Sequence, residues 1–156
     1  MHERLNPYVA APDAVKAMQE TSLKLAASSI EHSLQELVKI RASQINGCAN
    51  CLHMHTADAR KHGETEERIY LLSAWRESLL YTPRERAALG WTEALTLIAQ
   101  TQAPDADYEA LKAEFTPKEK VELTLLIGTI NAWNRLSVGF RTVHPNDRKQ
   151  AARQAA

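Results

Sequence analysis

The residues best suited to chemistry in this chain are two cysteines and a histidine close together in the sequence. Cys48, Cys51 and His55 are spaced three and four residues apart, and the chain has no other cysteine. In a helix each residue turns by about 100°, which places the three side chains within about 60° of one another. A helix N-terminus favours a thiolate, an adjacent imidazole can take the thiol proton, and a second thiol can trap a sulfenic acid as a disulfide. The spacing therefore predicts a redox-active thiol pair.

The spacing alone leaves open which thiol reacts first. Gly47 ends one helix and the next begins at about Cys48, so the helix dipole favours Cys48 as the attacking thiol. His55 lies one turn beyond Cys51, which favours Cys51 instead. His53 points to a different face of the helix and is expected at the surface.

Three other interpretations apply to the same cysteines. A zinc site would use both thiolates with His53 or His55, but structural zinc normally needs four ligands and no second Cys or His pair lies elsewhere. Covalent haem attachment needs a histidine directly after the second cysteine, and Leu52 at that position excludes it. The third interpretation is that both cysteines are small buried hydrophobic residues without a chemical role.

A carboxylate near the thiols would complete a proton relay, and Glu36 on the preceding helix is the candidate. On a helical wheel Glu36 falls opposite the main apolar stripe of its helix, which indicates a solvated charge. It shares its side with Ile40 and Ser43, which leaves open a second buried face. Periodicity by itself therefore favours a surface charge over a relay residue.

The elements that must position these side chains have helical periodicity, and strand-like alternation is absent. The sequence predicts an all-α protein with a bundle of six or seven helices. We expect helices from about Pro12, over His32–Asn46, Ala49–His62 and Thr65–Leu80, from Thr82, over Pro104–Phe115, and from Pro117. The residues expected to face inward include Val15, Met18, Leu25, Leu34, Leu37, Val38, Ile45, Ile69, Leu72 and Leu79.

Two of these helix starts carry the same signal. Thr82–Glu85 and Thr116–Glu119 both place Thr at the N-cap, Pro at the first helical position and Glu three residues after the cap. In a capping box of this kind the Thr and Glu side chains satisfy two backbone N–H groups, and the missing N–H of proline costs nothing there. Both segments therefore predict the first turn of a helix.

The helix after Pro117 is apolar over much of its circumference, which indicates either the centre of the bundle or a surface covered by a partner subunit. Its apolar residues are Val121, Leu123, Leu125, Leu126, Ile127, Ile130 and Trp133. The chain also carries no net charge to keep copies apart, with 19 Lys plus Arg against 19 Asp plus Glu. We therefore expect the protein to self-associate.

Composition excludes several classes of protein. Zero net charge argues against a nucleic-acid or anionic-membrane binder. A length of 156 residues with 44% hydrophobic residues fits one domain, expected over residues 1–140 with a tail at 141–156. Leu123–Ile130, the longest nearly apolar stretch, is too short to span a membrane, and the first residues lack a signal-peptide core. With only two cysteines, we expect a soluble cytoplasmic protein rather than a secreted disulfide scaffold.

The stretch from Glu36 to Cys48, followed by Cys51 and His55, resembles the alkyl hydroperoxidase D-like branch of the carboxymuconolactone decarboxylase family. The shared pattern is a Glu twelve residues before the first Cys and then C-x-x-C-x-x-x-H. The likeness continues through three further stretches, Ala74–Ser78, Arg84–Leu89 and Ile130–Arg135. It therefore covers nearly the whole chain.

This resemblance implies an all-α homo-oligomer, often a trimer or hexamer, that reduces hydroperoxides through its thiols without haem, metal or flavin cofactor. It also implies a role for each residue: Cys51 attacks the peroxide, Cys48 resolves the sulfenic acid, His55 activates the thiol, and Glu36 is the carboxylate of the relay. An external dithiol would be the reductant. The resemblance thus makes a peroxidase the leading hypothesis.

Two positions depart from the family pattern. Asn50 stands where the better-studied peroxidases have a histidine, and His53 where close single-domain relatives commonly have an acidic residue. The Asn50 departure favours an alternative, a disulfide oxidoreductase or redox sensor without significant peroxide turnover. A non-enzymatic metal-binding or oligomeric scaffold is the other alternative.

Overall fold

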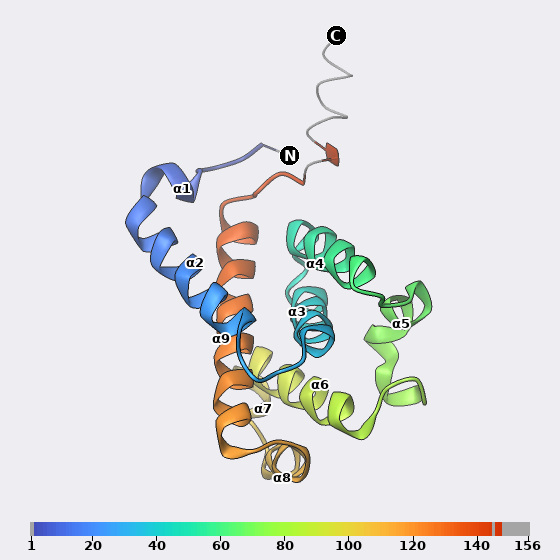
Figure 1. Ribbon diagram of the computed structural model, residues 1–156. Coiled ribbons are helices and arrows are strands. Elements are labelled where there is room, and N and C mark those ends of the chain that lie inside the picture. The colour runs from blue at the N-terminus through green and yellow to red at the C-terminus, as the bar shows by residue number, and fades with distance from the viewer. Residues whose placement is uncertain (1, 145, 148–156) are drawn as a thin grey trace.

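Helices are the regular elements of the described part of the chain, residues 2–144, 146 and 147 of a computed structural model (Figure 1). The elements are α1 (Pro7–Ala10), α2 (Pro12–Ala26), α3 (His32–Asn46), α4 (Ala49–Lys61), α5 (Glu66–Leu71), the 3-10 helix η1 (Leu72–Glu77), α6 (Pro83–Thr96), α7 (Ile98–Thr101), α8 (Asp105–Glu114) and α9 (Pro117–Gly139). The predicted all-α class is confirmed. Leaving out the one-turn helices α1 and α7, seven of the nine α-helices remain, which agrees with the six or seven predicted.

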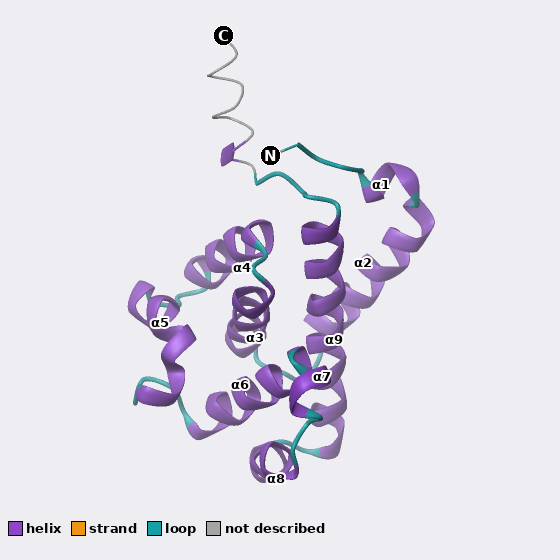
Figure 2. Ribbon diagram, turned by 180° about the vertical axis from the view of Figure 1, so that it is seen from behind, coloured by secondary structure: helices purple, strands orange, loops and turns teal. Residues whose placement is uncertain are grey.

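Helix α3 lies at the centre of the bundle, where it packs against α4, α6 and α9. Helix α9 is the longest and runs the length of the molecule with α2 beside it (Figure 1 and Figure 2). The N-terminus and the end of α9 lie together at one end of the molecule, where the Arg4 backbone N–H donates to the Phe140 carbonyl at 2.9 Å. Helix α8 lies at the other end, against α6.

Helix α3 is buried on two faces because its apolar side chains project from two sides of the helix. Leu34 and Val38 join a core cluster with residues of α2, α6, α8 and α9. Leu37 and Ile40 join a second cluster with residues of α4, α5, η1 and α6. Burying a leucine or isoleucine side chain stabilises the fold by about 1.5–3 kcal/mol, so both faces contribute. The second buried face explains why Glu36 is also buried, at 2% exposed.

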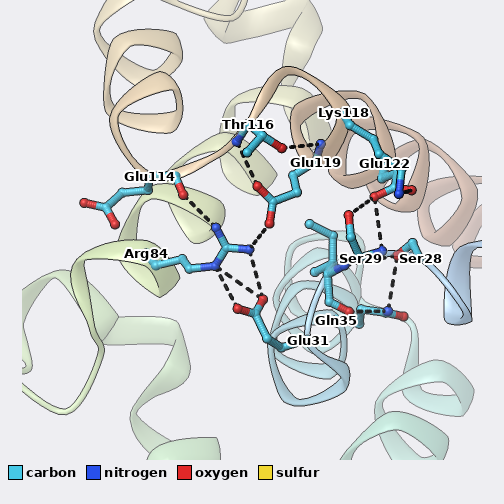
Figure 3. A network of polar contacts seen from close by, with 11 residues as sticks. Ser28, Ser29, Glu31, Gln35, Arg84, Glu114, Thr116, Lys118, Glu119 and Glu122 are labelled. Carbon is cyan, nitrogen blue, oxygen red and sulfur yellow. Dashed lines mark hydrogen bonds and ion pairs between the residues drawn. The ribbon is translucent and has the colours of Figure 1, made fainter.

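Both predicted capping boxes are present, at Thr82–Glu85 and Thr116–Glu119. Arg84, in the first turn of α6, joins these helix starts to the rest of the bundle (Figure 3). Its guanidinium donates to the Glu119 carboxylate at 2.6 Å, to the Glu31 carboxylate at 3.0 Å and to the Glu114 carbonyl at 2.6 Å. The starts of α3, α6 and α9 are therefore tied together through one side chain.

The predicted continuous helix over Thr65–Leu80 is wrong. Helix α5 ends at Leu71, η1 follows, and Ala74 inside η1 has non-helical dihedrals of φ −115° and ψ 26°. Ile69, Leu72 and Trp75 are buried, but Leu79 is 100% exposed. A 3-10 helix turns by about 120° per residue rather than 100°, and the chain leaves the helix at Ser78, so Leu79 no longer continues the inward face.

The other inward-facing residues follow the predicted periodicity closely. Val15, Leu25, Leu34, Leu37 and Val38 are buried, and Met18 and Ile45 are half-buried. Gly47 ends α3 and has φ 64°, a left-handed conformation that glycine adopts without strain.

Helix α9 buries only part of its apolar circumference. Leu123, Leu126, Ile127 and Ile130 are in the core, whereas Val121 and Leu125 are 59% and 54% exposed. No helix in the described residues is both long enough and apolar enough to cross a membrane. Of the predicted tail, only residues 141–144, 146 and 147 lie within the part of the chain described here.

Candidate active site

The turn between α3 and α4 places the two cysteines. Gly47 takes its left-handed conformation directly after α3, the Gly47 N–H donates to the Gln44 carbonyl at 3.3 Å, and the Cys48 N–H donates to the Ser43 carbonyl at 3.0 Å. This pair of bonds is a Schellman motif, which satisfies the last carbonyls of α3 and reverses the chain. Cys48 is consequently the N-cap of α4, and Cys51 lies in its first turn.

Cys48 and Cys51 are joined by a disulfide, with their Cα atoms 5.4 Å apart. The Cys48 sulfur also accepts a hydrogen bond from the Cys51 backbone N–H at 3.3 Å, as an N-cap side chain does. Both residues are buried, at 1% and 2% exposed. The two thiols predicted to act as a redox pair are therefore within bonding distance at the positive end of the α4 dipole.

His55, one turn after Cys51 on α4, meets Glu36 from α3. The His55 Nδ1 lies 2.8 Å from the Glu36 Oε2, and both side chains are buried. A carboxylate only accepts hydrogen bonds, so Nδ1 carries the proton of this bond and Nε2 is the ring nitrogen that Glu36 does not engage. The structure thus brings together Glu36 and His55, two residues 19 positions apart in sequence.

Glu36 remains a carboxylate in this buried place because it has cationic and hydrogen-bonding partners. Burial opposes its charged form, but the His55 hydrogen bond and the Lys39 ammonium outweigh burial and hold the pKa of Glu36 below its ordinary value. The Lys39 Nζ lies 2.7 Å from the Glu36 Oε1, and His32 Nε2 lies 3.9 Å from the same oxygen. Each carboxylate oxygen of Glu36 therefore has its own partner.

Two contacts of the candidate site were not predicted from the sequence. The Ser137 hydroxyl of α9 lies 3.8 Å from the Cys51 sulfur, and Lys39 pairs with Glu36 as described. Lys39 could have been found as the residue three positions after a candidate relay carboxylate on the same helix. Ser137 could have been found as the next member of an i, i+4, i+7 series with Ile130 and Asn134 on α9.

An asparagine network fixes α9 beside the cysteine turn. The Asn46 amide donates to the side-chain oxygens of Asn131 and Asn134, at 2.9 Å each. The Asn134 amide in turn donates to the Ser43 hydroxyl at 3.0 Å, and both Asn134 and Ser43 are fully or almost fully buried. Because buried polar groups are costly without partners, this network sets the register of α9 against the end of α3 and so places Ser137 near Cys51.

The comparisons with known proteins show the family of the chain. The model of the carboxymuconolactone decarboxylase family matches residues 12–94, which include Glu36, both cysteines and His55. The chain belongs to this family, in its alkyl hydroperoxidase D-like branch.

Individual relatives extend the match over nearly the whole chain. YdfG, an uncharacterised protein of Bacillus subtilis, is 46% identical over 140 residues, covering 90% of this chain and 95% of its own length. A solved structure from Agrobacterium tumefaciens, of unknown function and proposed to be the antioxidant defence protein AhpD, is 48% identical with a TM-score of 0.90, over 92% of this chain and 99% of its own. A peroxidase-related protein from Ralstonia eutropha, described as an alkylhydroperoxidase AhpD core, has a TM-score of 0.78 at 18% identity, over 90% of this chain and 75% of its own, and shows the shared fold.

One group of side chains with the spacing of metal ligands includes Glu36 and His55. Within the described residues, Glu36, His55 and Asp58 each offer one ligand atom, and these atoms lie within 4.8 Å of one another. The Lys39 ammonium already neutralises Glu36, and disulfide-bonded cysteines offer no thiolate. The arrangement is better suited to moving a proton than to holding a metal ion.

His53 is exposed, as its position on the helical wheel predicts. Its ring makes an edge contact with His144, with the ring centroids 4.2 Å apart. His53 therefore faces away from the pair formed by Glu36 and His55.

Proposed function

We propose that the protein is a cysteine-based peroxidase that reduces hydroperoxides through Cys51 and Cys48. The observation that carries this proposal is the buried hydrogen bond between His55 and Glu36, one helical turn from a disulfide-forming cysteine pair. This arrangement supplies a base, an orienting carboxylate and two thiols, which are the parts that thiol peroxidase chemistry needs.

In the first step His55 Nε2 takes the proton of the reduced Cys51 thiol. The thiolate attacks the terminal oxygen of the hydroperoxide, an S–O bond forms and the O–O bond breaks. Cys51 is oxidised to the sulfenic acid, and the proton held on His55 passes to the alkoxide that leaves, which gives an alcohol. Glu36 holds the imidazole in the orientation that leaves Nε2 free and stabilises the imidazolium between these two transfers.

In the second step the Cys48 thiol attacks the sulfenic sulfur of Cys51. The disulfide forms and water leaves, so the enzyme is oxidised by two electrons for each hydroperoxide reduced. An external dithiol then reduces the disulfide by thiol exchange and is itself oxidised to its disulfide. We place the protein in the cytoplasm on this basis, because a reducing compartment keeps such a dithiol available.

Steady-state peroxide consumption with dithiothreitol or dihydrolipoamide tests this function. Wild-type protein is expected to turn over repeatedly, and Cys51→Ser is expected to lose all thiol-dependent turnover. Cys48→Ser is the matched control, because without added dithiol it is expected to react once and stop at a sulfenic acid that dimedone labels. Activity unchanged in Cys51→Ser would overturn the assignment.

A second candidate function is disulfide exchange or redox sensing without peroxide turnover. Asn50, between the two cysteines, is the observation that favours it. A reduction potential near that of thioredoxin, about −270 mV, together with negligible peroxide consumption would support this candidate over the peroxidase.

We also propose that the protein is a homo-oligomer, a trimer or hexamer. Val121 and Leu125 expose apolar surface one turn apart on α9, and the chain has no net charge to oppose association. Light scattering is expected to give a mass of several chains at micromolar concentration, and Leu125→Glu is expected to lower it. A stable monomer in the wild-type protein would contradict this proposal.

A further inference from the structure

We propose that Lys39 is a positioning residue that sets the lower pH limit of Cys51 reactivity by holding Glu36 ionised and turned toward His55. This inference rests on the proposed function, because it assigns a role within the same relay. Lys39 touches neither cysteine in any contact of the described residues; it acts through Glu36.

The geometry divides the Glu36 carboxylate between two partners. Lys39 Nζ lies 2.7 Å from Oε1 and His55 Nδ1 lies 2.8 Å from Oε2. The Lys39 side chain is only 16% exposed, three residues after Glu36 on α3. The Lys39 backbone carbonyl also accepts a hydrogen bond from the Ser43 hydroxyl at 2.7 Å, which ties Lys39 to the asparagine network. With Oε1 occupied, Oε2 is directed at His55.

The charged groups around the relay come from α3 and α4. Helix α3 supplies Glu36, Lys39 and His32, whose Nε2 is 3.9 Å from the Glu36 Oε1. Helix α4 supplies Asp58, with a carboxylate oxygen within 4.8 Å of the ligand atoms of Glu36 and His55. On the cysteine side, α9 contributes the neutral Ser137.

His62, directly after α4, packs against His32 with the two rings tilted by 46° and their centroids 4.2 Å apart. The His62 Nδ1 lies 2.8 Å from the Asp58 carbonyl oxygen. At Glu36 Oε1, the Lys39 ammonium at 2.7 Å is closer than His32 Nε2 at 3.9 Å, so Lys39 is the partner that holds this oxygen.

Removing a cation makes it easier for every neighbouring acid to keep its proton. Without Lys39, Glu36 would bind a proton at higher pH, and the proposed relay needs Glu36 ionised so that it accepts the His55 Nδ1 hydrogen bond. The loss of an opposite charge at hydrogen-bond distance typically raises the pKa of a carboxyl group by about one unit or more. The acid-side midpoint of Cys51 reactivity should therefore move to higher pH.

The experiment measures alkylation of Cys51 by iodoacetamide as a function of pH, in full-length protein carrying Cys48→Ser so that one thiol remains. In this background Lys39→Gln is expected to raise the acid-side midpoint by about one pH unit, which lowers the alkylation rate about tenfold below the midpoint. Lys39→Arg, which restores the cation, is expected to keep the midpoint within about 0.3 of the parent. Lys112→Gln is the matched control, because Lys112 pairs with Glu109 at the same i, i+3 spacing on the exposed surface of α8.

An unchanged midpoint in a folded Lys39→Gln protein would overturn the proposal, as would an equal shift in Lys112→Gln. Lys39→Met, which keeps the aliphatic stem, decides the question if the Gln variant unfolds, and the same upward shift is expected from it. A shift found only in the melting temperature, with the midpoint unmoved, also overturns the proposal because it indicates a structural role alone. Alkylation does not require peroxide, so a protein with the predicted shift but no peroxide turnover would contradict the proposed function and leave this inference standing.

Discussion

Two clusters in this molecule each pair glutamates with basic side chains, but the two clusters differ in the chemistry that they allow. One joins Arg84 to Glu31 and Glu119 at the starts of three helices (Figure 3). The other joins Glu36 to Lys39 and His55 beside the cysteine turn. Both hold a glutamate whose pKa is below its ordinary value, Glu119 and Glu36, and in both a basic side chain contributes to that shift.

The difference lies in what each cluster leaves unpaired. Arg84 is a permanent cation, and its donors are directed to two carboxylates and the Glu114 carbonyl, so no proton can be exchanged at neutral pH. His55 uses only its Nδ1 for Glu36, which leaves Nε2 outside this hydrogen bond. A lowered glutamate pKa alone does not identify an active site; a titratable partner next to a nucleophile does.

The largest effect is expected from removing the imidazole. His55→Ala should lower the rate of Cys51 oxidation by peroxide by about 10²- to 10⁴-fold, because general-base assistance contributes that much. Stopped-flow measurement of sulfenic acid formation checks this, and Arg84→Met should leave that rate within a factor of about two. Equal losses in both variants would remove the distinction between the clusters.

A smaller effect on the rate is expected at Glu36. Orienting partners behind metal-bound histidines are worth roughly 10- to 100-fold, and Glu36→Gln, which keeps the shape but not the charge, should cost a similar amount here. The same stopped-flow assay at pH 7 measures it, with circular dichroism as the check on folding. A rate equal to that of wild type would mean that the carboxylate charge has no part in the relay.

For Arg84→Met the expected loss is in stability. The methionine keeps contact with the Phe115 ring, over which the Arg84 guanidinium lies at 4.0 Å, but loses three hydrogen-bonded partners. Because these hydrogen bonds involve charged, half-buried groups, their loss should lower the free energy of unfolding by about 2 kcal/mol. Urea denaturation at pH 7 measures this value, and a change below about 0.5 kcal/mol would show that the cluster is not structural.

The smallest effect is a dependence of stability on pH that comes from Glu119. The Thr116 backbone N–H, followed by the Thr116 side chain and Arg84, lowers the pKa of Glu119 from 4.5 to about 2. A lowered pKa stabilises the folded state above pH 4.5, and that contribution is lost as the pH falls from 4.5 toward 2. Glu119→Gln should therefore flatten the decline in unfolding free energy below pH 4.5, while Glu109→Gln on the exposed face of α8 should not. Parallel declines in all three proteins would contradict this.

The fold was largely predictable because its signals are local. The capping boxes at Thr82 and Thr116, the stop at Gly47 and the apolar periodicity of α3 each depend on residues within a few positions. The error at Leu79 has the opposite cause. Arg86 donates to the carbonyls of Trp75, Arg76 and Ser78, and this contact from α6 stabilises a 3-10 end that no local pattern indicates.

The site was predictable in its residue types but not in its contacts. Cys48, Cys51 and His55 follow from spacing along one helix. Glu36 is different, because a helical wheel places it opposite the main stripe and only the packing of a second core face buries it. Ser137 reaches Cys51 only through the docking of α9, which depends on asparagines 85 and 88 residues away from Asn46.

The most direct test of the central claim is the stoichiometry of a single oxidation. Fully reduced protein is mixed with one equivalent of tert-butyl hydroperoxide without added dithiol, and free thiols, intact mass and residual peroxide are measured. The account predicts that one peroxide is consumed for every two thiols lost and that the mass falls by two hydrogens through the Cys48–Cys51 disulfide, with no such change in Cys51→Ser. Peroxide and thiols that both persist in the wild-type protein, or thiols lost equally in Cys51→Ser, would contradict it.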